Sequence, residues 1–397
     1  MLIQIIVALL LGILVGVFTG LFPGIHINLV GAFLVTLSST FLAGISPIYL
    51  IVFIASLAIA HTFIDFIPSI FLGCPDSDTE LSVLPGHELL KQGEGHSAIM
   101  RTAYGGLISI FILVLLTLPL VHLISWIYPI IRKLIPFILI FVCFLMIFSE
   151  KKKFSAAVVL ILTGFFGVCV LNLNLKEPLL PLLSGLFGSS MMLMSINQNT
   201  KIPKQKTLSE KLNLKKVYKP ILAALIASPL CGFLPGLGGG QAAVIGNQIS
   251  RSDKKDFLIL LGAVNILVMG ISFISLYSIS KTRTGASAAI QSLIGTLNLN
   301  LLILIIIICL FSGVLSFFLT KFLSLKFLKI IEKVNYKKLS IGILIFLSII
   351  ICMISGILGF FVFIVSTATG IYCISLNVKR TQMMGCLLIP TIILYLF

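Results

Sequence analysis

Residues 1–30 read MLIQIIVALLLGILVGVFTGLFPGIHINLV, and no Asp, Glu, Lys or Arg occurs before Asp65. A helix needs about 20 consecutive apolar residues to cross the hydrocarbon core of a bilayer. Because residues 1–22 lack a basic n-region and an obvious cleavage site, we expect them to form the first membrane helix and not a removable signal peptide. Further charge-free runs follow at 102–131, 134–149, 154–175, 178–200, 220–250, 257–280, 284–320, 339–378 and 381–397.

The composition is that of a membrane protein. Hydrophobic residues make up 59% of the 397, only 10% are charged, and the mean hydropathy is +1.20. A soluble domain carries about 25% charged residues, so a cytosolic enzyme, a disordered protein and a disulfide-rich secreted domain are excluded. The apolar runs are continuous and not alternating, which excludes a transmembrane β-barrel. We predict an all-α polytopic integral protein of the cell membrane, with about 10–13 transmembrane or half-membrane helices.

Basic residues gather in short connectors and predict the orientation of the chain. The net charge is +16, and lysines cluster at 151–153, 201–219 and 321–338. The positive-inside rule places the last two connectors in the cytoplasm, next to anionic lipid headgroups. An even number of crossings must then separate them, so either 284–320 crosses twice or a broken segment re-enters the face that it left. No fold or aromatic patch supports a nucleic-acid partner.

A pentapeptide recurs 212 residues apart, once in each half of the chain. Gly20-Leu21-Phe22-Pro23-Gly24 reappears as Gly232-Phe233-Leu234-Pro235-Gly236. Pro removes a backbone donor and Gly permits left-handed angles, so each copy should end a helix inside the membrane. Helices broken at matching places mark the substrate site of secondary transporters, where the amides of half-helix N-termini favour an anion. The alternatives are packing kinks or short loops at the membrane surface.

The repeated pentapeptide predicts two inverted-topology repeats, residues 1–200 and 217–397, joined by a basic cytoplasmic linker at 201–216. His26 and Asn28 could donate hydrogen bonds to a substrate carboxylate, or bond to nearby backbone instead. The predicted substrate-binding residues around the two breaks are Pro23, Gly24, His26, Asn28, Pro235, Gly236, Gly238, Gly239, Gly240 and Gln241.

The densest polar segment, 61–101, contains half of the twelve acidic residues. Asp65 stands alone among apolar neighbours, and a carboxylate inside a membrane is a functional candidate by default. We predict it as the ion-coupling residue for a proton or Na⁺; the alternative is a position at the membrane edge that faces water. Asp76, Asp78 and Glu80 could hold Mg²⁺ or Ca²⁺. Their spacing lacks the glycine and the distant glutamate of an EF-hand loop, so a solvated turn or a helix cap is favoured.

Two polar residues of the second half are further candidates for the substrate site. Asn265 lies in the apolar run 257–280. Arg283 stands beside a glycine and could clamp an anion with two hydrogen bonds, or serve as an ordinary loop charge. The eight cysteines are dispersed, and no zinc-ligand spacing, HExxH, P-loop or GxSxG motif occurs. We therefore expect no disulfide, no metal or other cofactor and no ATP-driven pump.

At these motifs the chain resembles the large membrane subunit of the tripartite tricarboxylate transporter family, and is similar to its short archaeal branch. The resemblance rests on GLFPGIHIN at 20–28, FLGCP at 71–75 and LPGLGGGQ at 234–241. It implies two inverted halves, ion-coupled carboxylate uptake and, in bacterial systems, a small membrane subunit and an extracytoplasmic binding protein. It also implies that Pro23, Gly24, Pro235 and Gly236 line the substrate site. The resemblance assigns a second membrane loop of the first half to Gly73, Pro75 and Asp76.

The chain departs from the bacterial pattern in two ways, because it is shorter and lacks a second Leu-Gly-x-Pro motif. The residues and the resemblance together predict a secondary permease, not an enzyme, that moves small organic anions, with carboxylates expected, by alternating access. The alternative is a membrane-embedded metal-dependent enzyme that acts on a lipid phosphate through Asp76, Asp78 and Glu80. A scaffold without a transported ligand is a third reading. The sequence leaves open the substrate, the coupling ion and whether the protein forms a homo-oligomer.

Overall fold

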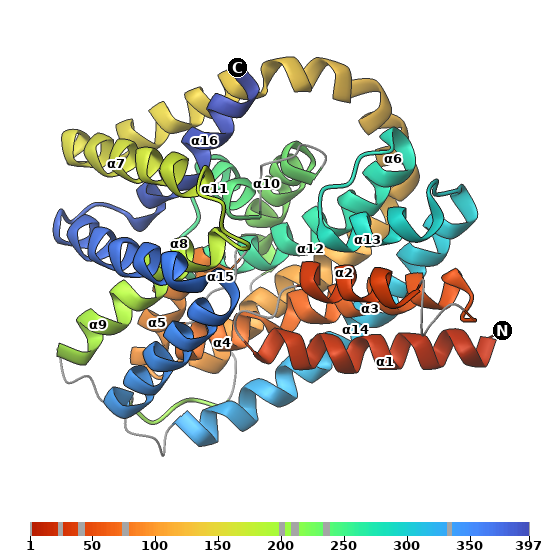
Figure 1. The fold of residues 1–397 in the computed structure, drawn as a ribbon, viewed down its shortest axis with the longest axis horizontal. Helices are drawn as coiled ribbons and strands as arrows, with labels where there is room; N and C mark the ends of the chain where they lie inside the picture. Colours follow the sequence, from red (N-terminus) through yellow and green to blue (C-terminus); the bar gives the residue numbers. More distant parts are fainter. Residues whose placement is uncertain are drawn as a thin grey trace.

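The computed structural model describes residues 2–22, 27–38, 44–73, 79–197, 203–207, 214–232, 239–331 and 336–396, and its ordered elements are all helical (Figure 1). Within these ranges, seven helices are long and apolar enough to cross a membrane, and five shorter apolar helices accompany them. Together they lie within the predicted 10–13 elements. The all-α polytopic fold is therefore confirmed.

The elements follow one another along the chain with short connections. In order they are α1 (Leu2–Leu21), α2 (Ile27–Ser38), α3 (Pro47–Ile64), α4 (Phe66–Leu72), η1 (Glu80–Ser82), α5 (Val83–Lys91), α6 (Gly95–Phe148), α7 (Lys153–Leu171), α8 (Leu179–Leu183), η2 (Ser184–Ser189), α9 (Ser190–Asn197), α10 (Leu214–Gly232), α11 (Gly239–Ser250), α12 (Lys254–Ile279), α13 (Gly285–Ile294), α14 (Leu299–Ile331), α15 (Tyr336–Ser375), η3 (Arg380–Met384) and α16 (Gly385–Leu396).

Burial separates an inner layer of helices from an outer one. Every residue in the most apolar window of α12 is buried, as is 94% of the window in the continuous segment Pro47–Leu72, whereas α1 and α15 bury 28% and 22%. Side chains on the outer helices are apolar although exposed, as expected for a surface that faces lipid. Helix α6 is about 80 Å long at 1.5 Å per residue, far more than a bilayer, and bends where Pro119, Pro129 and Pro136 interrupt it.

Helix α2 returns the chain toward the face where α1 begins and packs on α13 and α3, so we describe α1 and α2 as a hairpin. Helix α1 runs parallel to α3, because the Tyr49 hydroxyl at the start of α3 donates to Gln4, 2.5 Å away, while Gly20 lies against Ile64 at the end of α3. Gly12 and Gly16 allow this approach: a Cβ at either position would lie 2.5 Å from a carbonyl oxygen of α3. Because α3 starts beside the start of α1, α2 must lead the chain back to the face where α1 begins.

Helices α10 and α11 form the corresponding hairpin of the second half. Helix α10 packs along α12, as α1 packs along α3. At the offset of 212 residues, Gly12 and Gly16 correspond to Ala224 and Ser228, which are fully buried on α10. Small residues four apart thus allow close helix packing in both halves.

Ion pairs place the loop between α11 and α12 on the same face as the basic connectors. Glu94, just before α6, pairs with Lys206 of the 201–219 connector at 3.3 Å and with Lys255 at the start of α12 at 2.7 Å. His96 Nδ1 lies 2.8 Å from Ser324 Oγ, which brings the basic end of α14 to this face as well. The connectors therefore share a side, as predicted.

The chain between the connectors 201–219 and 321–338 must cross the membrane an even number of times, and this arrangement shows how it does so. Helix α12 leaves the face that carries Glu94 and α14 returns to it, while the hairpin α10–α11 enters and re-emerges there. Helix α13 has only 10 residues, too few to cross. The broken segment re-enters, and 284–320 does not cross twice.

The two hairpins therefore open on opposite faces. The segment α3–α4 starts beside the N-terminal end of α1 and leads across to α5 and Glu94 (Figure 1). The positive-inside rule assigns the Glu94 face to the cytoplasm, so we expect the N-terminal end of α1 outside.

Single cysteines should report this topology. Ser46, before α3, and Thr207, in the basic connector, are both exposed. In a variant without the eight native cysteines, Ser46→Cys should react with a membrane-impermeant maleimide on intact cells, and Thr207→Cys only after permeabilisation. Labelling of both positions from the outside would contradict the assigned orientation.

Candidate functional site

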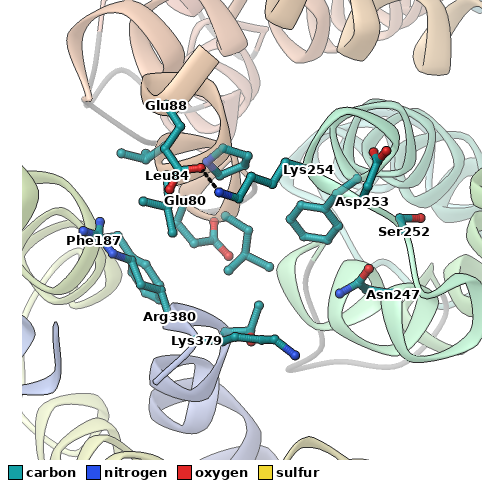
Figure 2. A pocket seen from close by; sticks show the side chains of 15 residues that line it. Glu80, Leu84, Glu88, Phe187, Asn247, Ser252, Asp253, Lys254, Lys379 and Arg380 are labelled. Atoms are coloured by element: carbon teal, nitrogen blue, oxygen red, sulfur yellow. Dashed lines mark ion pairs between the residues drawn. The ribbon is translucent and has the colours of Figure 1, made fainter. Parts of the chain in front are cut away.

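A cavity of about 230 Å³ lies between elements of the two halves, at the end of the molecule where α12 begins (Figure 2). Residues of η1 and α5 line one wall, the end of α11 and the start of α12 line the facing wall, and η2 and η3 contribute the rest. The lining residues are Glu80, Leu81, Val83, Leu84, Pro85, Glu88, Phe187, Asn247, Ser252, Asp253, Lys254, Phe257, Lys379, Arg380 and Thr381.

Glu80 marks the deep end of the cavity. Only 1% of its surface is exposed, and a side chain at Gly240, in the first turn of α11, would collide with its Oε1 atom. The carboxylate of the first half therefore lies against the N-terminus of a helix from the second half. The partial positive charge at a helix N-terminus stabilises an anion at this place.

At the outer end of the cavity, two lysines form ion pairs with glutamates and one aspartate caps a helix. Lys254 Nζ lies 2.5 Å from Glu88 Oε2, across the cavity between the two halves (Figure 2). Lys379 Nζ lies 3.7 Å from Glu150, and Asp253 caps α12 by accepting a hydrogen bond from the Asp256 amide at 2.8 Å. Lys254 and Lys379 are each about two-thirds exposed, so this end of the cavity is open to water.

Arg380 lines the cavity from the first residue of η3 and is half-buried. It lies near enough to Glu88 to feel its charge. No carboxylate of the described residues is within ion-pair distance of its guanidinium. The remaining lining is mostly apolar, which strengthens electrostatic interactions within the cavity.

Comparison with known proteins identifies the kind of protein to which this cavity belongs. Residues 6–385 match the model of the tripartite tricarboxylate transporter TctA family. The chain belongs to the TctA family. It is also similar to an uncharacterised protein of Methanocaldococcus jannaschii, with 32% identity over 355 residues that cover 87% of this chain and 88% of the relative. No solved structure matches.

Membership of the TctA family confirms the resemblance drawn from the sequence motifs. TctA proteins are multi-pass membrane permease subunits of a transporter family, which agrees with the seven membrane-length helices among the described residues. In tripartite systems such a subunit works with a binding protein and a small membrane subunit.

Many of the residues predicted around the two breaks of this TctA chain lie outside the described residues. These are Pro23, Gly24, His26, Pro75, Asp76, Pro235, Gly236 and Gly238. Asn28 lies in the first turn of α2 by its backbone. Gly239, Gly240 and Gln241 are buried in the first turn of α11, and Gly240 is the predicted site residue that contacts Glu80.

The other predicted residues of the TctA site are spread along the inner helices. Asp65 is buried between α3 and α4, and Asn265 is buried in the middle of α12. Arg283 follows the far end of α12, which is about 39 Å long, so it does not meet the cavity at the start of α12. Near it, the Ser287 hydroxyl and the Thr284 side chain cap α13, so this helix start is capped by its own residues.

Two cavity residues differ from what the sequence predicted. Glu80 was expected in a solvated turn or helix cap, but it is buried against α11. Arg380 was not predicted as a site residue, although Lys379-Arg380 is a basic pair between two long charge-free runs. That isolation is a signal that could have identified it. Among the described residues, no group of three His, Cys, Asp or Glu side chains could hold a metal ion.

Gly73 and His87 hold α4 against α5 beside the cavity. Gly73 ends α4 in the left-handed conformation, with φ +66°, and a Cβ there would lie 3.2 Å from the His87 ring. The ring also bonds to the backbone of Ile70. Burial, with the nearby charges of Lys91 and Arg380, lowers the pKa of His87 to about 3. The ring is therefore neutral at any physiological pH.

Neutral His87 should make stability depend on pH. Between about pH 6.5 and 3, the unfolded chain binds a proton at this position that the folded protein does not, so stability falls as the pH falls through this window. Thermal unfolding of the purified protein should show this loss, and His87→Gln should flatten it. His122→Gln, at an exposed position, is the control; an unchanged slope in His87→Gln would contradict the assignment.

Proposed function

We propose that this TctA family member is a secondary permease that moves small organic anions, with carboxylates as the substrate class, by alternating access. The observation that supports the proposal is the matching arrangement in the two parts of the chain, where α1 packs along α3 and α10 packs along α12 and α11. Inverted repeats with broken helices allow one half to rock against the other around a fixed site near the midplane. We take residues 1–200 and 217–397 as these halves.

The depth of α11 supports a substrate site at the break in the second half. Helix α11 has 12 residues, so its first turn lies about 18 Å from the cytoplasmic end of the hairpin, near the middle of the bilayer. Amides at a helix start inside the membrane favour a negatively charged group. By the same logic, Pro23, Gly24, His26 and Asn28 would serve the first half.

The cavity gives the proposed substrate a route to the cytoplasm. It extends from buried Glu80 beside α11 to the exposed ammonium groups of Lys254 and Lys379. Because residues of both halves line it, a rocking motion would open and close it. We therefore interpret this conformation as the one that faces inward.

A proton or sodium gradient is the proposed energy source, and Asp65 is the candidate carrier. It is 6% exposed in the central segment α3–α4, and an ionisable residue at such a place is a functional candidate by default. We propose that the partners of tripartite systems, a small membrane subunit and an extracytoplasmic binding protein, assemble with this chain. A binding protein would deliver substrate on the face opposite to Glu94.

Uptake of labelled di- and tricarboxylates into proteoliposomes tests this function, with Na⁺ and pH gradients imposed separately. We expect gradient-driven uptake, and a loss of about 90% or more from Gly24→Leu and from Gly236→Leu, since each removes a predicted site (~1.4 kcal/mol for tenfold). Gly342→Ala is the control, because a Cβ there meets nothing within 4 Å. No uptake of any carboxylate, with a lipid-phosphate activity lost in Asp78→Asn, would favour the enzyme alternative.

A further inference from the structure

One ion pair crosses the cavity at the start of α12 and joins its two walls. Glu88, on α5 of the first half, holds a carboxylate oxygen 2.5 Å from Nζ of Lys254, the first residue of α12 in the second half (Figure 2). Both residues line the cavity. A carboxylate of the protein thus already occupies the place where the carboxylate of the proposed substrate would meet Lys254.

We propose that Lys254 binds a carboxylate of the substrate in this cavity, and that Glu88 occupies Lys254 when no substrate is present. The inference rests on the proposed function and adds to it a residue that binds the anion and a residue that competes with it. One carboxylate replaces another at the same ammonium group, and neither a covalent bond nor a proton is transferred. The competition keeps binding weak, which suits a place from which the anion is released.

The ion pair of Glu88 and Lys254 is exposed enough for an incoming anion to break it. Two-thirds of the Lys254 side chain and one-third of the Glu88 side chain are exposed. Ion pairs that water can reach contribute little, because hydration of the separate charges offsets most of their attraction, and opening one changes an equilibrium constant by up to about fivefold. A buried pair would resist exchange, since breaking it leaves an unpaired charge away from water.

Positive charge remains near Glu88 once the substrate takes its place on Lys254. Arg380 lines the same cavity, and both Arg380 and Lys91 lie near enough to Glu88 to feel its charge. No carboxylate of the described residues lies within ion-pair distance of the Arg380 guanidinium. The displaced carboxylate is therefore compensated by these cations and by water, and the exchange does not leave an unpaired buried charge.

The other lysine of the cavity is less suited to this exchange. Lys379 pairs at 3.7 Å with Glu150, which does not line the cavity, whereas Lys254 reaches across to the opposite wall. Asp253, next to Lys254 in the chain, accepts a hydrogen bond from a backbone amide in the first turn of α12. Of the described carboxylates, only that of Glu88 lies within ion-pair distance of Lys254. Glu88 is therefore the one acid of this cavity that competes directly for Lys254.

Calorimetric titration of the purified full-length protein with citrate, tricarballylate and fumarate tests the proposal in a double-mutant cycle. Glu88→Gln removes the competing charge and keeps the shape of the side chain, so it should tighten binding about threefold to fivefold. Lys254→Gln removes the binding cation and should weaken binding at least about fivefold. In the double variant, Glu88→Gln should no longer tighten binding, because the group for which the two carboxylates compete is absent.

Glu94→Gln is the matched control, because it removes the same charge outside the cavity lining, where Glu94 pairs with Lys206 and Lys255. Its affinity for the anions should stay near the wild-type value. Unchanged affinity in Lys254→Gln, or equal tightening by Glu88→Gln with and without Lys254, overturns this inference while the permease function stands. Failure of the wild type to bind any of the three anions overturns the proposed function and this inference with it. Size-exclusion profiles that match the wild type show that each variant is folded.

Discussion

Gly262→Ala should reduce the stability of the protein by about 3 kcal/mol or more, although it adds a single methyl group. Gly262 lies where α12 crosses α6, and a Cβ there would collide with the Thr102 carbonyl oxygen. Gly105 of α6 meets the Ile259 carbonyl of α12 in the same way. Because the obstacle is backbone on both sides, no side chain can move aside, and the two helices must separate.

The matched control is Gly342→Ala, which replaces a glycine inside α15 where a Cβ meets nothing within 4 Å. This variant should be neutral or more stable by up to about 1 kcal/mol, since alanine favours a helix more than glycine does. Thermal unfolding and the yield of monodisperse protein measure both variants. If Gly262→Ala unfolds at the wild-type temperature, α6 and α12 do not pack as closely as described.

The membrane helices could be predicted from the sequence because the bilayer imposes a local rule. Long charge-free runs such as 1–64 and 284–320 must be helical in lipid, since each backbone group needs a partner within its own segment. The basic connectors predicted which loops share a face, and the contacts of Glu94 with Lys206 and of His96 with Ser324 support it. The re-entrant hairpin α10–α11 was one of two alternatives, and only tertiary contacts could choose between them.

The cavity could not be predicted, because its residues come from six separate elements. Glu80 belongs to an acidic cluster that looks solvated in the sequence, and only the approach of α11 to η1 buries it. Arg380 lies about 300 residues further along the chain. No spacing rule links residues that far apart, so their place in the same cavity follows from tertiary packing, in which η3 contacts α7, α11, α15 and α16.

Tertiary packing also explains why residues predicted for one substrate site lie in different parts of the structure. Gly240 and Arg283 were both predicted as substrate-binding residues, but Gly240 lies near one end of the second half and Arg283 follows the far end of α12. The start of α13 is capped by hydroxyl groups of Ser287 and Thr284, whereas the start of α11 faces a carboxylate from the other half. A helix start that meets a charged group across the repeat interface is a stronger candidate than one capped by its own residues.

Gly240→Ala should therefore abolish most transport while the protein stays folded. A Cβ at Gly240 collides with Oε1 of Glu80 and lies 2.7 Å from the Met384 methyl group. Both atoms are at the ends of flexible side chains, so they can move aside at little cost to the fold. The methyl group would then displace the Glu80 carboxylate from the first turn of α11, and we expect carboxylate uptake to fall at least about tenfold (~1.4 kcal/mol).

Gly246→Ala provides the control within the same helix. A Cβ there meets the flexible end of Leu260 at 3.1 Å and does not approach Glu80, so uptake should stay near the wild-type rate. Glu80→Asp shortens the acid by one methylene group and makes room for the new methyl. If the carboxylate and α11 act together, the double variant of Gly240→Ala and Glu80→Asp should recover part of the uptake that Gly240→Ala loses. Normal uptake by Gly240→Ala alone would mean that substrate does not depend on this helix start, because the methyl group cannot be accommodated without moving Glu80.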